Sequence, residues 1–137
     1  MRTQESLEEV LRLIEDLRER SLEGETIIVE GERDRRSLRR LGIEGKIICS
    51  SQLSINSLLE LIEEKRIIIL TDWDEHGIER GRYLLKHLSS LGFKCDMELH
   101  RKFSALLKKE IKDIESLEKY VIKYANIYKS GKSRNYR

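Results

Sequence analysis

Short apolar runs rich in isoleucine and valine alternate along this chain with longer segments of helical periodicity, and this alternation constrains the fold more than any other feature. The runs at 26–29, 46–50 and 67–70 are predicted strands. Apolar residues recur at helical spacing around them, in segments 5–21, 54–65 and 77–91. Short buried strands that alternate with helices favour a mostly parallel sheet covered on both faces. We therefore predict an α/β fold of three layers with about four strands.

The remaining segments complete a single predicted domain. Phe93–Leu99 alternates apolar and polar residues, which indicates a fourth strand near an edge of the sheet. Two helices are predicted after Arg101, and the end of the chain has no periodicity but four basic residues without an acid. The organisation that we expect is an N-terminal helix packed on the domain at 1–25, a core at 26–99, C-terminal helices at 100–128 and a flexible basic tail at 129–137.

The composition is that of a globular protein. Hydrophobic residues make up 39%, enough for a core, and 27 basic residues against 25 acidic ones give a net charge of only +2. Nucleic-acid binding would therefore need a local basic patch. No apolar run reaches the roughly 18 residues of a membrane span, and no signal peptide is recognisable, so we expect a cytoplasmic protein without membrane contact. The abundant Glu, Lys, Arg and Ile are typical of proteins from hot environments. Cys49 and Cys95 are interpreted as core residues.

Acidic residues and a glycine directly follow two of the predicted strands. Glu30 and Gly31 follow the first strand, and Asp72, Asp74 and Gly77 follow the third. The functional crevice of a parallel sheet lies outside the carboxyl ends of its strands, so these acids meet if the two strands are neighbours. Two carboxylates about 5 Å apart repel by roughly 3 kcal/mol at an effective dielectric near 20. Such a cluster needs a proton or a divalent cation, and hard oxygen ligands suit Mg²⁺, with Mn²⁺ as a substitute.

A structural interpretation of these residues stays open. Asp and Gly are common in strand-to-helix turns, where Asp72 or Asp74 can simply cap the next helix. Two acids separated by a single residue are therefore, on their own, weak evidence for a metal site. A Glu-Gly pair after one buried strand together with an Asp-x-Asp-Gly pattern after another is far more specific. A glycine at each turn also lets a phosphate approach the following helix N-terminus.

These residues resemble the Toprim domain of topoisomerases, bacterial-type primases, recombination proteins and ribosomal-RNA maturation nucleases. The matching segments are Val29-Glu30-Gly31 with Asp34, and Thr71-Asp72-Trp73-Asp74 with Gly77. The resemblance covers about residues 26–99 and is strongest to small stand-alone Toprim proteins of archaea and bacteria. It implies a compact, Rossmann-like sheet and an acidic Mg²⁺ site.

The resemblance also implies roles for individual residues. Glu30 takes the position of the general acid or base and is also expected to bind the metal, while Asp72 and Asp74 take the positions of the metal-binding pair. Asp34 and His76 are auxiliary candidates, and His76 stands where some members have a third aspartate. The acid pair is also similar to the DxDx(T/V) loop of haloacid-dehalogenase-like phosphatases. Here, however, the fifth position is histidine, and the loop follows the third strand rather than the first.

Basic residues flank both acidic turns. We predict phosphate or nucleic-acid contacts for Arg33, Arg36 and Arg80, together with Gly31 and Gly77, because arginine binds phosphate in a bidentate way. The alternative is a solvated helix face on which arginines pair with nearby acids.

The combined expectation is Mg²⁺-dependent phosphoryl transfer on a nucleic acid, by a nuclease acting on structured RNA or DNA, for example in RNA processing. A chain of 137 residues is too short for a topoisomerase or a complete primase. The alternative is a non-catalytic, Mg²⁺-containing nucleic-acid-binding module that works within a larger protein assembly. The oligomeric state stays open.

Overall fold

A parallel sheet with helices on both faces forms the body of the computed structural model, which describes residues 3–135. The described residues form four strands, in the spatial order β2-β1-β3-β4, and every neighbouring pair is parallel. The strands are β1 (Thr26–Val29), β2 (Ile47–Cys49), β3 (Arg66–Ile69) and β4 (Lys94–Asp96). The helices are α1 (Thr3–Leu22), α2 (Glu32–Arg40), α3 (Ile55–Leu61), α4 (Glu75–Ser90), α5 (Glu98–Leu107) and α6 (Leu117–Asn135). The predicted α/β fold is confirmed.

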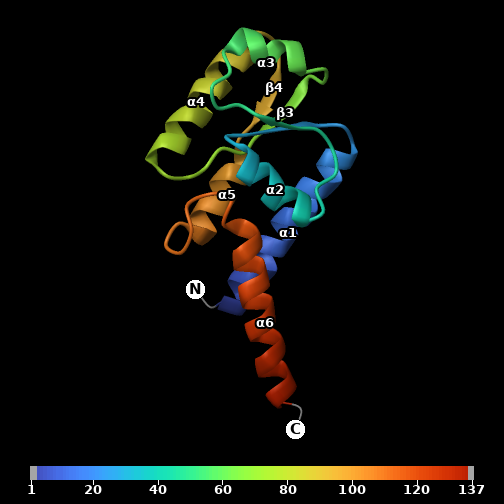
Figure 1. The fold of residues 1–137 in the computed structure, drawn as a ribbon, viewed down its shortest axis with the longest axis vertical. Helices are drawn as coiled ribbons and strands as arrows, with labels where there is room; N and C mark the ends of the chain where they lie inside the picture. The colour runs from blue at the N-terminus through green and yellow to red at the C-terminus, as the bar shows by residue number, and fades with distance from the viewer. Residues whose placement is uncertain (1–2, 136–137) are drawn as a thin grey trace.

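Successive residues of the central strands face opposite sides of the sheet. Ile27 and Val29 of β1 join one core cluster with residues of α1, α5 and α6, whereas Ile28 joins a second cluster with residues of α3 and α4. Figure 1 shows α3 and α4 on one side of the sheet and α1, α2 and α6 on the other. All residues of β1 are buried, which explains why the central strands are continuous apolar runs.

Two boundaries differ from the sequence-based expectation. The fourth strand is an edge strand, as predicted, but it ends at Asp96 because the Asp96 side chain accepts a hydrogen bond (2.6 Å) from the Glu98 N–H at the start of α5. Leu99 therefore belongs to a helix, in which it is buried together with Phe103 and Leu107. Residues 129–135, expected to be an irregular tail, continue α6 to Asn135, and the last two residues of that predicted tail lie outside the described range.

The terminal helices pack on each other as well as on the domain. α1 contacts α5 and α6, and α6 also contacts α2. In Figure 1, α6 reaches beyond all the other elements. Within residues 3–135, no helix combines the length and the apolar character that crossing a membrane requires.

A candidate acidic site at the carboxyl edge of the sheet

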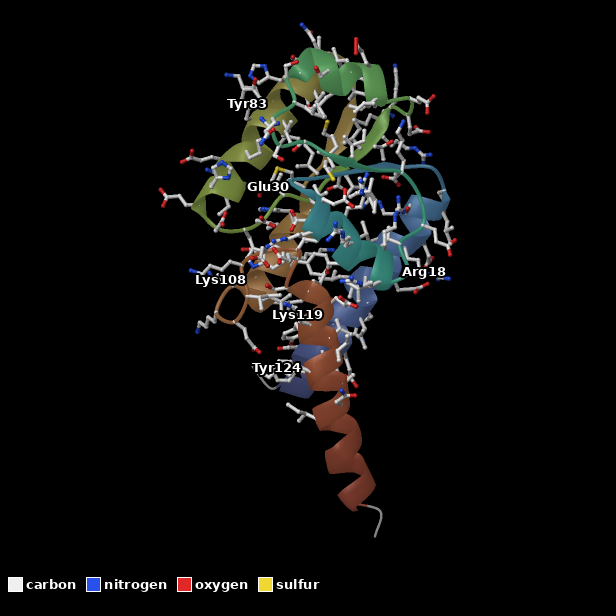
Figure 2. The ribbon with its side chains drawn as sticks, viewed as in Figure 1. Arg18, Glu30, Tyr83, Lys108, Lys119 and Tyr124 are labelled. Atoms are coloured by element: carbon white, nitrogen blue, oxygen red, sulfur yellow. The ribbon has the colours of Figure 1, made fainter. Side chains whose placement is uncertain are left out.

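The two acidic turns lie side by side because β1 and β3 are hydrogen-bonded neighbours. Ile28 is paired with Ile69, and the Leu70 N–H donates to the Ile28 carbonyl at 2.8 Å. Glu30 is the first residue after β1 and Asp72 is the third after β3, and the Asp72 N–H donates to Glu30 Oε2 at 2.9 Å. Figure 2 shows Glu30 near the middle of the molecule, between α4 and α2. Adjacent strand ends thus bring the first acid of each motif together.

Asp34 joins these two acids from the first turn of α2. It is only 6% exposed, and its carboxylate accepts hydrogen bonds from the Gly31 N–H and the Glu115 N–H, both at 3.0 Å. Burial in the first place, together with the nearby charge of Glu30, raises its pKa to about 6, although the two N–H donors act in the opposite direction.

Asp72 is the most strongly perturbed acid of the site. Burial, followed by the charges of Asp34 and Glu30, raises its pKa to about 8, although a hydrogen bond from the Ile114 N–H to Oδ1 (3.0 Å) opposes the shift. A carboxyl with this pKa carries a proton at neutral pH. When no cation is bound, the proton on Asp72 therefore relieves the repulsion among the carboxylates of the site.

The three acids line an open cleft of about 340 Å³. Its other lining residues include Gly31, Arg33, Ser51, Asp113 and Glu115. The floor of this cleft is thus rich in carboxylate oxygens, which are the ligands of hard divalent cations. Among the described residues, however, no group of three or more His, Cys, Asp or Glu side chains is already arranged to hold a metal ion.

Asp74 does not line this cleft. Its Oδ1 accepts a hydrogen bond from the Gly77 N–H at 2.7 Å, which makes it the N-cap of α4. Gly77 itself is required by packing, because a Cβ at this position would lie 2.1 Å from the Asp72 carbonyl oxygen. In this structure Asp74 therefore acts as a helix cap, which was the structural alternative. Packing against Asp72 accounts for Gly77 without any bound phosphate.

Gly31 is a different case. A Cβ there would meet no atom closer than Asp34 Oδ2 at 3.9 Å, and the backbone φ of −143° suits any residue. The fold does not demand a glycine at this position, which lies in the wall of the acidic cleft.

His76 contacts the acidic site from the outside. Its side chain is 82% exposed, and Nδ1 lies 3.2 Å from Glu30 Oε1. Glu30 is therefore held through Oε2 by the Asp72 N–H and meets an exposed imidazole through Oε1.

The three predicted phosphate-binding arginines lie in different surroundings. Arg33 is 78% exposed at the rim of the cleft, with its guanidinium 3.8 Å from the Glu115 carboxylate. Arg36 is 61% exposed and 3.8 Å from Glu32, and it lines a neighbouring hollow between α2 and α6. The Arg80 guanidinium, by contrast, donates to the carbonyls of Ser50 (2.8 Å) and Leu53 (3.3 Å) and so holds the loop after β2.

The loop between α5 and α6 is a part of the site that sequence reasoning missed. The Trp73 N–H donates to the Lys112 carbonyl at 2.9 Å, and the Trp73 indole N–H donates to the Ile111 carbonyl at 2.7 Å. The same loop supplies the N–H groups that bind Asp72 and Asp34. Loop 111–115 therefore fixes the orientation of Asp72, which follows β3, and of Asp34, which lies in the first turn of α2.

His100 is a second residue that was missed. It is buried, and its Nε2 lies 2.9 Å from the Asp72 carbonyl oxygen. Its spacing from Phe103 and Leu107 puts it on the buried face of α5, and this spacing was a usable signal in the sequence.

Comparisons with known proteins identify the family of this chain. The Toprim domain model matches residues 25–106. A UPF0292 protein of Methanosarcina barkeri is 41% identical over 119 residues, which cover 85% of this chain and 83% of that protein. A UPF0292 protein of Methanocaldococcus jannaschii is 34% identical over 126 residues, covering 90% and 98%. A solved structure from Aquifex aeolicus has a TM-score of 0.65 at 31% identity, covering 77% of this chain and 94% of that one. This chain is therefore a small Toprim domain protein and belongs to the family of the archaeal UPF0292 proteins.

Proposed function

We propose that this protein is a Mg²⁺-dependent nuclease that cleaves phosphodiester bonds in structured RNA or in DNA. Membership of the Toprim family indicates a metal-dependent function related to nucleic acids. The observation that carries the finer proposal is the pair formed by Glu30 and Asp72 in an open acidic cleft, where the pKa of Asp72 is raised. Perturbed acids in a cleft are typical of catalytic sites.

The donor set of the cleft fits a divalent cation. Carboxyls whose pKa is raised by burial and by neighbouring carboxylates release their protons when a cation supplies the missing positive charge. Asp72 and Glu30 would hold Mg²⁺ or Mn²⁺. Asp74, predicted as a further ligand, caps α4 through Oδ1 and does not line the cleft, so it would contribute less. When bound, the cation would neutralise the charge that develops on a phosphate.

Residues of this chain supply proton transfer and substrate orientation. Glu30 is anchored through Oε2, so Oε1 is the atom that would exchange a proton with the attacking or leaving oxygen. His76, next to that atom, would pass the proton to or from water. Arg33 at the rim would orient the nucleic-acid backbone, and the absence of a side chain at Gly31 leaves room for a phosphate beside the N-terminus of α2.

The decisive experiment is cleavage of labelled structured RNA, single-stranded DNA and double-stranded DNA in Mg²⁺ or Mn²⁺. We expect metal-dependent cleavage that is lost in EDTA and in Glu30→Gln, but kept in Glu60→Gln, which removes an exposed acid of α3. Equal activity of the two variants would mean that a contaminating nuclease or another site is responsible.

A second candidate is a Mg²⁺-containing nucleic-acid-binding module that acts within a larger assembly. The capping role of Asp74 favours it, because a ligand engaged by the fold is less available for catalysis. In the cleavage experiment, this module would bind nucleic acid in a salt-dependent way and leave every substrate intact.

A further inference from the structure

A larger hollow lies beside the acidic cleft, between α4 and α5 at the end of β4, with a volume of about 590 Å³. Its apolar lining includes Ile78, Leu85, Met97 and Ala105, and its exposed cationic lining includes Arg82 and Lys108. We refer to these six residues as the α4–α5 groove. Figure 2 shows Lys108 at the end of α5, on the side of the molecule where α4 lies.

The α4–α5 groove and the acidic cleft share a wall. His100 lines the groove, and its Nε2 contacts the carbonyl oxygen of Asp72, whose residue lines the cleft. Ile78 of the groove directly follows Gly77, which packs against the same carbonyl. A chain-like ligand that leaves the acidic cleft can therefore pass over this wall into the groove, or over Arg33 and Glu115 into the hollow between α2 and α6.

Most charges around the groove are already paired. Asp96 lies 2.9 Å from Arg20, and Arg101 donates from Nε to Glu98 at 2.9 Å. Arg82 and Lys108 differ, because neither side chain has a hydrogen bond or an ion pair with the groups that the structure describes. The groove thus combines an apolar lining with two uncommitted positive charges.

We propose that the α4–α5 groove binds one nucleotide of a single-stranded nucleic acid. A nucleotide joins a flat, largely apolar base to an anionic phosphate, which matches Leu85, Met97 and Ala105 on one side and Arg82 and Lys108 on the other. The volume falls in the range of about 300–1,000 Å³ that small-molecule sites occupy. The base must be unpaired to enter, because a paired base is stacked within a duplex. Met97 adapts its shape, so the groove discriminates little among the bases.

This inference specifies the substrate of the proposed function and rests on it for the claim that the ligand is a nucleic acid. The test is anisotropy of a labelled short oligonucleotide on the full chain in EDTA, so that binding is measured without cleavage. We compare Arg82→Glu with Lys86→Glu, which reverses a charge one turn further along α4 outside the groove. Arg82→Glu should weaken single-strand binding about tenfold and lower its salt slope by about one. Lys86→Glu should change both far less, and duplex should bind more weakly than single strand.

The contribution of the base is tested separately. Ala105→Leu fills the groove without changing any charge, and a helix accepts leucine well. It should weaken binding of the normal oligonucleotide but not of an abasic one of equal length. Thermal denaturation of each variant establishes that it is folded.

Several results would overturn the proposal. Equal effects of Arg82→Glu and Lys86→Glu, or no single-strand binding by the wild type, would do so. Competition by a mononucleotide as strong as by the oligonucleotide would assign the groove to a free nucleotide instead. If Arg82→Glu changed the molecular mass of the protein in solution but not its binding of the oligonucleotide, the groove would instead be a contact with a second copy of the chain. If the wild type cleaves nucleic acid and the groove variants bind normally, only the proposal for the groove is wrong. If binding depends on the groove but no substrate is cleaved, only the nuclease proposal is wrong.

Discussion

Asp72 combines two properties that rarely coincide in one side chain. It is held by a backbone N–H of loop 111–115, and its carboxyl nevertheless has a pKa raised to about 8, because burial and the charges of Asp34 and Glu30 outweigh that hydrogen bond. In the unfolded chain the same carboxyl titrates near its ordinary value of 3.8. The folded protein therefore binds more protons than the unfolded chain between these two pH values.

The first prediction concerns the pH dependence of stability. Because the folded state holds the extra proton, the free energy of unfolding of the metal-free protein should fall as pH rises from about 4 to about 8. Asp72→Asn cannot ionise, yet its Oδ1 still accepts from Ile114. The variant should therefore be about 1–2 kcal/mol more stable than the wild type at pH 8, after allowance for solvent screening, and the difference should shrink towards pH 4. Urea denaturation in EDTA at several pH values measures this, and parallel curves for the two proteins would contradict it.

The two glycines of the motifs give a second prediction. Gly77→Ala places a Cβ against the Asp72 carbonyl, so it should destabilise the protein by about 2 kcal/mol or more. Gly31→Ala meets open space and should cost about 1 kcal/mol or less. Thermal denaturation distinguishes them. If Gly31→Ala keeps its stability but loses cleavage, the glycine serves the substrate, whereas full activity would remove it from the phosphate site.

At the scale of single residues, the sequence predicts those contacts that form between the ends of neighbouring strands. Glu30 and Asp72 meet because each lies within three residues of the end of a buried strand and the strands are neighbours. The bond between Asp34 and the Glu115 N–H joins residues 81 positions apart, and no local pattern encodes such a contact. The use of Asp74 as a cap was one of two interpretations that its position allowed.

Loop 111–115 is the element that completes the acidic site. It lies beyond residues 25–106, the range matched by the Toprim model, yet it orients acids inside that range. Trp73 anchors the loop through its backbone N–H and its indole, and the indole also stacks on Phe103 with ring centroids 6.1 Å apart. Trp73 is buried and belongs to the core cluster that also contains Phe103.

The third prediction tests this anchor. Trp73→Phe keeps an aromatic ring in the core but leaves the Ile111 carbonyl without its donor, which should cost about 1–3 kcal/mol. Hydrogen exchange measured by mass spectrometry should become faster in loop 111–115 than elsewhere. Tyr83→Phe, which removes a hydroxyl from an exposed ring of α4, is the control. Unchanged exchange in the loop would show that the backbone bond to Lys112 suffices.

Among the elements, the buried strands were predicted most accurately, because cover on both faces requires continuous apolar runs. The edge strand was predicted too long, since Leu99 satisfies a strand pattern and a helix pattern equally well until the Asp96 turn is known.

On the scale of the whole molecule, a net charge of +2 conceals an uneven distribution. Arg33, Arg36, Arg40 and Lys119 line one hollow between α2 and α6, next to the acidic cleft, and share it with Glu115 and Glu118. Binding of nucleic acid should therefore depend on this region rather than on the overall charge.

The fourth prediction tests whether nucleic-acid binding depends on the basic residues between α2 and α6 or on the overall charge. Arg33→Gln with Arg36→Gln should lower the salt slope of nucleic-acid binding by about two. Arg12→Gln with Arg18→Gln removes the same charge from exposed ion pairs of α1 and should leave the slope unchanged. Equal slopes for the two double variants would mean that the bulk charge governs binding.

The position of Trp73 also makes the protein its own optical probe. It is the single tryptophan of the chain, only 4% exposed, and it stands between the two aspartates of the motif. Its emission therefore originates from one known place, next to the carboxyls under study. Titration with Mg²⁺ or Mn²⁺ can be followed without a label, as a change in the intensity or wavelength of that emission. Quenching by Mn²⁺, a paramagnetic ion, would in addition report how closely the metal approaches the indole.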